Sequence, residues 1–302
     1  MIITILQQLC NIAISAFKRV AKPLTVFTIP PESCHIRALS TEGMFQRFEN
    51  MRPYSHPLSP IPVNGDRYAL PADFVNGLAF LRPLLPRKGD WFDTQVNVLG
   101  GKLYLLTTSL VIEYDAGSLD IPDWGFSPET IRMLEAFKTP PIEVYIDRAD
   151  LCFQWHDEQE FFVHEPHLLR PGSTHRQMAV DAFTHYRHFN QGVEVTNAMR
   201  RDLRRMHGGA KLAKDIYLND QEIVSRMSGD GKTWTSETST PFLSNADRTM
   251  RFDRKAFLDM IRVADEINFS TSPICFRHAH GSGMLVERTL GSDIPTFGGA
   301  DD

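Results

Sequence analysis

The stretch 151–165, LCFQWHDEQEFFVHE, returns later in the chain as 274–287, ICFRHAHGSGMLVE. Residues 151–153 match 274–276 and residues 161–163 match 284–286, so both matches lie 123 positions apart. Each copy has two short apolar strands around a polar turn, at 156–159 in the first copy and at 280–283 in the second, which is a hairpin pattern. A single hairpin cannot bury its own apolar face, so its return indicates a repeated domain.

An amphipathic helix is predicted before each hairpin. The first, 127–138, begins with Ser127 in the N-cap position and a proline directly after it. The second, 253–264, repeats the same apolar spacing. The predicted buried faces are Ile131, Leu134 and Phe137 in the first helix, and Phe257, Met260, Ile261 and Ala264 in the second.

A second pair of helices, 73–85 and 196–207, lies further upstream, with matching residues 125 apart. Hairpin-like stretches follow them, and Val96 in the first corresponds to Ile216 in the second. Each half therefore reads strand, helix, strands, helix, strands. The offsets drift because loops of different length separate equivalent elements, whereas a chance match would not recur in order.

In this element order the chain resembles the DNA sliding clamps, the ring-shaped processivity factors of replicative polymerases. The resemblance covers about 67–290 and rests on the order of elements, on 252–269, and on the counterpart 126–146. It implies an α+β fold of two repeated clamp-like domains, each with two helices packed under antiparallel sheets. The chain departs from the family in its N-terminal extension, in the prolines at 83 and 86, and in lacking a partner-binding motif.

Composition agrees with two globular domains, since 302 residues are 42% hydrophobic and 23% charged. Five segments are predicted: a poorly ordered, proline-rich extension 1–65, a domain 66–167, a connector 168–176, a domain 177–290 and a tail 291–302. The apolar start, 1–20, lacks the positive first region of a signal peptide and is expected to be an appendage. Cys152 and Cys275 are expected to be small buried hydrophobes in a reducing, cytoplasmic compartment.

Basic residues gather on the predicted helices. The segment 196–214 holds six basic side chains against Asp202. The helical segments with their flanks, 71–88, 127–138, 196–214 and 253–264, together carry +8, while the whole chain carries −5. A charge run is usually a solvated face, but a ring whose helices face phosphates needs this segregation. The candidate DNA-binding residues are Arg200, Arg201, Arg204, Arg205, Lys211, Lys214, Arg254, Lys255, Arg262, Arg82, Arg87, Lys88, Arg132 and Lys138.

Catalytic and metal sites are not predicted, and no cofactor is expected. The histidines nearest to a ligand set are His156, His164 and His167, with acidic neighbours at 158, 160 and 165, but the first two fall on opposite arms of a hairpin and no HExxH motif occurs. No Ser/His/Asp arrangement stands out. The chain is therefore expected not to be an enzyme.

The resemblance implies a function and a set of partners. Six clamp-like domains form a ring, so two per chain imply a homotrimer that encircles duplex DNA, tethers a DNA polymerase and is opened by a clamp-loader ATPase, in a bacterium or a phage-infected host. Client motifs would dock between the domains beside the connector and the tail, at Leu168, Leu169, Pro171, Ile294, Pro295 and Phe297. A monomeric DNA-binding processivity factor, a structural protein that reuses the repeat, and a metal-dependent hydrolase remain as alternatives.

Overall fold

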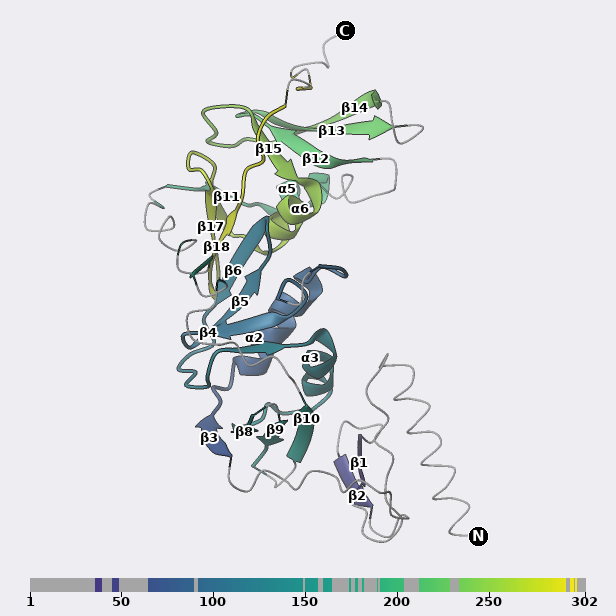
Figure 1. The fold of residues 1–302 in the computed structure, drawn as a ribbon. Helices are drawn as coiled ribbons and strands as arrows, with labels where there is room; N and C mark the ends of the chain where they lie inside the picture. Colours follow the sequence, from purple (N-terminus) through teal and green to yellow (C-terminus); the bar gives the residue numbers. More distant parts are fainter. Residues whose placement is uncertain are drawn as a thin grey trace, which may run out of the picture. The chain divides into compact units, whose positions relative to one another are not determined.

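The computed structural model describes residues 36–39, 45–48, 65–89, 92–148, 150–156, 160–164, 191–203, 212–228 and 234–291, with the single residues 174, 177, 178, 181, 189, 294, 295 and 297. The chain divides into two compact units (Figure 1). Unit 1 comprises Met1–Leu85, Thr94–Leu103 and Ala116–Arg170, and unit 2 comprises Pro86–Asp93, Tyr104–Asp115 and Pro171–Asp302.

Both halves of the sequence contain the predicted alternation of strands and helices. A short antiparallel pair, β1 (Ile36–Leu39) and β2 (Phe45–Phe48), lies in the N-terminal extension. The first half then has β3 (Asp66–Ala69), α2 (Phe74–Leu81), η1 (Arg82–Leu84), β4 (Val96–Leu99), β5 (Lys102–Leu106), β6 (Leu110–Tyr114), β7 (Trp124–Phe126), α3 (Pro128–Glu135), β8 (Glu143–Asp147), β9 (Asp150–Gln154) and β10 (Glu160–His164).

The second half repeats this order within its described residues. Its elements are β11 (Val193–Glu194), α5 (Asn197–Leu203), β12 (Leu212–Leu218), β13 (Glu222–Ser228), β14 (Trp234–Pro241), β15 (Met250–Asp253), α6 (Arg254–Val263), β16 (Glu266–Asn268), β17 (Ile274–His278) and β18 (Gly281–Leu285). The two hairpins predicted from the repeated stretch are confirmed as β9–β10 and β17–β18.

Both halves of the sequence are built on antiparallel sheets. The larger sheets have the strand orders β10-β9-β8-β3, β14-β13-β12-β15 and β11-β16-β17-β18-β6-β5-β4-β7. In the last of these, β6 groups with unit 2 and pairs with β18, from Gly281 opposite Tyr114 to Leu285 opposite Leu110. The predicted α+β class with helices and antiparallel sheets is confirmed.

Strand register confirms most of the repeat and corrects one part of it. Val96 pairs with Phe126 as Ile216 pairs with Phe252, so these four residues are equivalent as predicted. In the hairpins, however, Cys152 pairs with Phe162 and Cys275 pairs with Met284. The second strands are therefore offset by 122 residues, and the match of 161–163 to 284–286 was wrong by one position. A slip of one residue exchanges the two faces of a strand.

The turn predicted at 280–283 is also misplaced. β17 ends at His278 and β18 begins at Gly281, so a two-residue turn leaves the glycines at 281 and 283 inside the strand. A Cβ at Gly283 would lie 2.2 Å from Cζ of Phe276 and 2.6 Å from the carbonyl oxygen of Val111 on β6. Close approach of a ring and a neighbouring strand, and not a turn, therefore requires glycine here.

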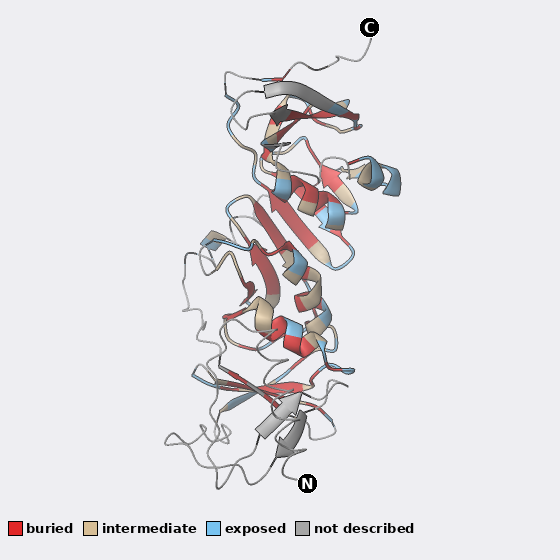
Figure 2. Cartoon of the chain, turned by 90° about the vertical axis from the view of Figure 1, so that its right-hand side faces the viewer, coloured by how far each residue is buried: buried red, intermediate tan, exposed pale blue. Residues whose placement is uncertain are grey.

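Helix α3 begins at its predicted cap, and α2, α3 and α6 bury their predicted faces, whereas in α5 Leu203 is buried and Met199 is half-buried. The Ser127 hydroxyl accepts a hydrogen bond from the Thr130 amide at the start of α3, and the Asp253 carboxylate accepts one from the Ala256 amide at the start of α6. Figure 2 shows buried residues on the helices and along the strands beside them. The predicted apolar stripes are buried, namely Phe74, Leu78, Leu81, Ile131, Leu134, Phe137, Phe257, Met260, Ile261 and Ala264.

The cysteine prediction is confirmed for both described thiols. Cys152 and Cys275 form no disulfide and are fully buried at equivalent positions of β9 and β17. Trp124 and Trp155 are core residues as well. Each fully buried Phe or Leu in such a core contributes roughly 1.5–3 kcal/mol from area removed from water.

Candidate nucleic-acid interface

Helix α6 presents basic side chains opposite its buried stripe. Arg262 is exposed, Arg254 is half-buried, and Lys255 is exposed but forms an ion pair with Asp259 one turn along, at 2.5 Å. Such an i,i+4 pair at the surface contributes only about 0.3–0.5 kcal/mol, so Lys255 can exchange Asp259 for a phosphate at small cost.

Helix α5 carries two of the predicted arginines, and they differ in role. The Arg200 guanidinium donates to the backbone carbonyls of Ile261, at 3.2 Å, and Ala264, at 2.5 Å, and thereby caps the end of α6. Arg201 is exposed, with Asp202 at 3.8 Å. The structure thus places Arg200 as a link between the two helices, while Arg201 faces solvent.

Four further residues predicted around α5 do not lie on a described helix. Arg204, Arg205 and Lys211 fall outside the described residues. Lys214 is exposed, but it lies on strand β12.

Helices α2 and α3 form the corresponding pair in unit 1. Arg82, directly after α2, donates from Nε and Nη2 to the two carboxylate oxygens of Glu135 on α3, both at 2.9 Å. This two-point contact ties the ends of the helices together and occupies the Arg82 guanidinium. Arg132 is exposed beside Glu129, at 3.5 Å. Lys138 of this unit is exposed as well, and so are Arg87 and Lys88, which follow η1 in the sequence and group with unit 2.

Two groups of predicted cations therefore emerge. Arg82 and Arg200 hold helices in place, whereas Arg87, Lys88, Lys138, Arg201, Lys214 and Arg262 are exposed on the described surface. Flexible exposed cations suit phosphate oxygens, which carry charge but no sequence information. Burial of the arginine stem against a neighbouring helix end is invisible in a helical-wheel pattern, so the sequence could not separate the two groups.

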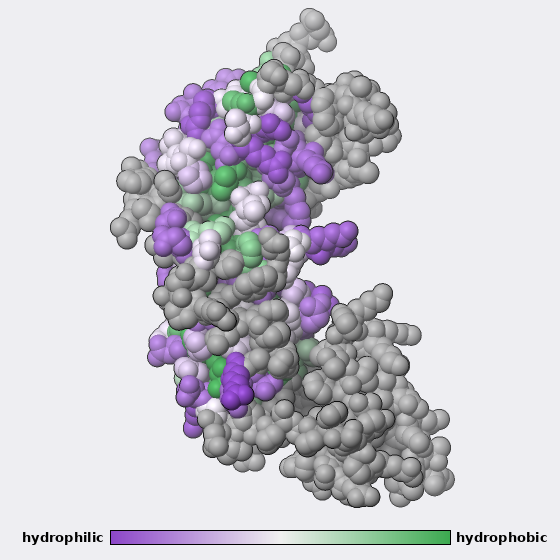
Figure 3. All heavy atoms as spheres, in the orientation of Figure 1, coloured by the Kyte–Doolittle hydropathy of each residue, from purple (hydrophilic) through white to green (hydrophobic). Residues whose placement is uncertain are grey.

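The predicted partner-binding residues are only partly described. Ile294 is 44% exposed, Pro295 is buried and Phe297 is intermediate, while Leu168, Leu169 and Pro171 lie outside the described residues. Sequence reasoning missed three other exposed apolar side chains in unit 2, namely Leu243, Val286 and Leu290. On the face drawn in Figure 3, hydrophilic residues predominate over the described surface and hydrophobic ones form small separate patches.

An alternating ionic cluster near the C-terminus was also missed. The Arg288 guanidinium contacts Asp215 of β12 and donates to Oδ2 of Asp253 at 2.8 Å. Arg251 of β15 donates to the other oxygen of Asp215 at 2.6 Å. These residues come from three separate stretches, so no local motif marks them.

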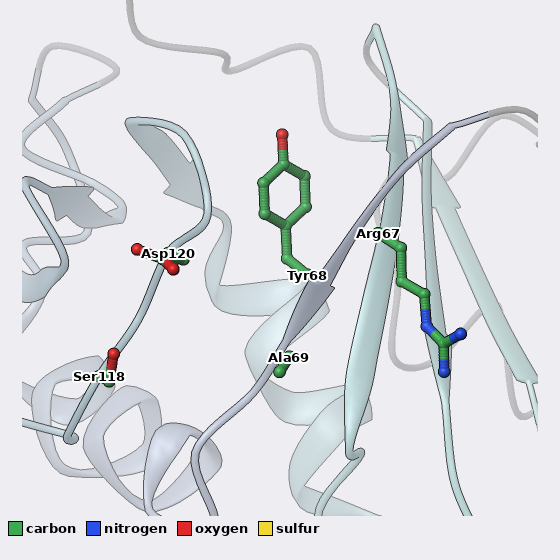
Figure 4. Close-up of a pocket in the computed structure, with 5 residues that line it drawn as sticks. All are labelled: Arg67, Tyr68, Ala69, Ser118 and Asp120. Carbon is green, nitrogen blue, oxygen red and sulfur yellow. The ribbon is translucent and has the colours of Figure 1, made fainter.

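One open depression of about 500 Å³ lies in unit 1, lined by Arg67, Tyr68, Ala69, Ser118 and Asp120. In Figure 4 the Arg67 side chain points away from Ser118 and Asp120, because neighbouring residues on β3 project to opposite faces. Arg67 instead donates to Glu143 at 2.6 Å. The lining contains no histidine or cysteine to serve as a base or nucleophile, and its polar groups do not converge.

Metal-ligand clusters and membrane-spanning helices do not occur in the described part of the chain. There, no group of three or more His, Cys, Asp or Glu side chains is arranged to hold a metal ion. His167 and the acidic residues at 158 and 165 lie outside those residues. Within the same described ranges, no helix has the length and apolar character needed to cross a membrane.

Known structures share this architecture. No model of a protein family and no curated protein matches the sequence. Among solved structures, the sliding clamp of Bacillus subtilis aligns with a TM-score of 0.57 and 12% identity, over 84% of this chain and 74% of that one. The Caulobacter crescentus clamp aligns at 0.57 and 12%, over 81% and 72%. The Helicobacter pylori beta clamp, bound to a DNA ligase peptide, aligns at 0.54 and 8%, over 83% and 73%. The chain therefore has the fold of the DNA sliding clamps.

Proposed function

We propose that this protein is a DNA sliding clamp, a homotrimeric ring that encircles duplex DNA and tethers a replicative DNA polymerase as its processivity factor. It acts in the cytoplasm as a scaffold without a catalytic reaction or a cofactor of its own. The clamp fold supports this proposal. The observation that carries it is that the outer edges of two sheets have no further strand among the described residues.

The internal repeat predicts which edge strands of neighbouring chains pair in the ring. The eight-stranded sheet consists of two groups of four strands, β11-β16-β17-β18 and β6-β5-β4-β7. In the repeat, β18 corresponds to β10, the end strand of β10-β9-β8-β3. Likewise β6 corresponds to β14, the end strand of β14-β13-β12-β15. β18 and β6 pair with each other, whereas neither β10 nor β14 has a described strand on its outer side. Pairing of β10 in one chain with β14 in the next would repeat the β18–β6 contact and cover both edges.

Such a head-to-tail contact closes into a ring when the rotation per chain divides a full turn. The six domains implied by the clamp resemblance set the number of chains at three, each of 34.4 kDa.

DNA passes through this ring beside the helices. The exposed cations of α5, α6 and the stretch after α2 bind phosphates without reading bases, which permits sliding. Arg204, Arg205 and Lys211 add to this surface in the proposal, together with Lys214 and Lys138. A clamp-loader ATPase opens the ring.

Client proteins dock at apolar residues of the connector and tail. The H. pylori clamp binds a DNA ligase peptide in its solved structure, and we propose peptide clients here as well. Leu168, Leu169 and Pro171 form one side of this client site, and Ile294, Pro295 and Phe297 form the other. Exposed Ile294 supports the assignment because an apolar side chain in a polar tail gains free energy from being covered.

Light scattering of a proline variant tests the ring. The Phe242 amide donates to the carbonyl of Gln221, which directly precedes β13, and hydrogen-bonded pairs alternate, so the N–H of Ser239 points away from β13 while that of Thr240 points toward it. Ser239→Pro therefore removes an outward donor and spares the β13 ladder.

The wild-type protein is expected at about three times the chain mass, and Ser239→Pro at the mass of one folded chain. Thr240→Pro, the matched control, should lower thermal stability instead. A wild-type monomer at micromolar concentration, or a Ser239→Pro trimer, would contradict the proposed ring.

A further inference from the structure

The segment after β18 is held to unit 2 by polar contacts. The Val286 amide donates to the Ser109 carbonyl at 2.8 Å, and the Arg288 amide donates to the Arg251 carbonyl at 2.7 Å. Arg251 also donates from Nη1 to the Thr289 carbonyl at 3.0 Å. The apolar side chains of Val286 and Leu290 remain exposed. Hydrogen bonds and charge therefore fix this segment, which we call the C-terminal strap (286–290).

The Arg288 side chain joins the strap to two other elements. Nη1 contacts Asp215 on β12 and Nη2 donates to Oδ2 of Asp253 at 2.8 Å. Both carboxylates are largely shielded from water, and Arg288 itself is 38% exposed. The planar guanidinium meets the two carboxylates with two separate nitrogens in a fixed geometry, which the compact ammonium of a lysine lacks.

Asp253 has a second task at the same carboxylate. Its Oδ1 accepts the Ala256 amide at 3.0 Å and so caps the first turn of α6. One carboxylate therefore serves the helix through one oxygen and the strap through the other. Arg288 fixes the orientation that the cap requires, because a carboxylate held at Oδ2 loses rotamer freedom.

We infer that Arg288 is a positioning residue that couples the order of the C-terminal strap to the order of the first turn of α6. If the proposed function holds, a client docked at the tail residues that follow the strap and the DNA beside α6 sense each other through this side chain. Coupling of this kind is reciprocal, so a change at either end must be felt at the other.

Arg248 supplies a matched control. It holds the same strap, donating from Nη2 to Oε2 of Glu287 at 2.8 Å. It also pairs with its neighbour Asp247 at 2.8 Å, and both of these carboxylates lie outside α6. Replacing Arg248 therefore loosens the strap without touching the cap.

Amide hydrogen exchange on the full chain tests the coupling with Arg288→Lys, Arg248→Lys and Asp253→Asn. Arg288→Lys should speed exchange at both 286–289 and 255–257, by roughly threefold or more at the Ala256 amide. Arg248→Lys should speed exchange at 286–289 alone. Asp253→Asn keeps a capping oxygen but loses the charge, and it should also loosen 286–289. Unchanged exchange at 255–257 in Arg288→Lys, or equal change there in Arg248→Lys, would overturn the inference.

A second measurement separates this inference from the proposed function. Fluorescence anisotropy with a 30-base-pair duplex should give a weaker affinity for Arg288→Lys than for Arg248→Lys. Failure of the wild-type protein to bind the duplex would refute the clamp proposal, while the exchange data would still decide the coupling.

Discussion

Gly283→Ala is expected to destabilise unit 2 although it adds a single methyl group. The new Cβ would lie 2.2 Å from Cζ of Phe276 and 2.6 Å from the Val111 carbonyl oxygen. The Phe276 ring is fully buried, and the carbonyl belongs to the adjacent strand β6, so neither can move aside freely. Overpacking costs about 1–3 kcal/mol, and alanine returns about 0.4–1 kcal/mol by restricting the unfolded chain.

The expected net loss is about 1–2 kcal/mol in the free energy of unfolding, or roughly 2–8 °C in Tm. Urea unfolding followed by circular dichroism gives the free energy, and calorimetry gives Tm. Phe276→Leu removes the ring carbons nearest to the new methyl group but leaves the Val111 carbonyl in place. The double variant should therefore recover part of the loss, with a coupling energy of about 0.5 kcal/mol or more.

Two results would refute this reasoning. If Gly283→Ala unfolds at the same urea concentration as the wild-type protein, close packing does not require glycine at 283. If the losses from Gly283→Ala and Phe276→Leu simply add, the Phe276 ring is not what the methyl group meets.

Three further predictions concern charge. The double variant Arg201→Glu, Arg262→Glu should bind duplex DNA more weakly and with a flatter salt dependence, by a slope of roughly 0.9 for each phosphate that is no longer neutralised. Its Tm should stay within about 1 °C of the wild-type value, as expected of exposed charges. An unchanged salt slope in anisotropy titrations would place these residues away from DNA. Arg200→Ala should lower the free energy of unfolding by about 1–3 kcal/mol, because two carbonyls at the end of α6 lose their donor. Arg201→Ala should not lower it. Equal urea midpoints for the two variants would contradict the capping role of Arg200. Burial lowers the pKa of His278, so the folded state binds fewer protons than the unfolded state and its stability falls as pH drops below about 6.5. His278→Gln should reduce the change of the urea midpoint between pH 7.5 and 5. An equally steep loss of stability in both proteins would exclude this histidine as the cause.

The position of His278 gives the pH prediction its sign. Its Nε2 lies 2.9 Å from the Glu113 carbonyl and donates to it, while Nδ1 accepts the His280 amide at 3.4 Å, so the neutral ring satisfies both hydrogen bonds. His280 lowers the pKa further, whereas the Glu113 backbone carbonyl and the Asp265 charge raise it. Burial is the largest of these effects.

Local patterns were enough to predict the helices and hairpins. Ser127 marked a helix start because a capping side chain acts on the next three residues. Apolar stripes marked buried faces because their spacing follows the helical period. The equivalence of Val96 with Ile216 followed from the order of elements.

Pairings between distant strands and helix ends were not predictable in this way. The hairpin match slipped by one residue because nine residues separate the paired Cys152 and Phe162, whereas eight separate the paired Cys275 and Met284. The apolar pattern alone does not show which residues pair. Gly283 was read as part of a turn because its neighbour Phe276 and the strand β6 meet it only in the folded chain. Arg200 was read as a phosphate ligand because the end of α6 that it caps lies more than 60 residues away.

Cys152 and Cys275 can serve as labelling sites that report how often each unit opens. Each is a fully buried thiol outside any disulfide, one in unit 1 and one in unit 2, at equivalent positions of the repeat. Burial raises the pKa of the Cys275 thiol, so this sulfur reacts slowly until its surroundings open. With Cys10 and Cys34 replaced by serine, pulse labelling and mass spectrometry would time the opening of each unit separately within one chain. The ratio of the two labelling rates would show which unit opens more readily.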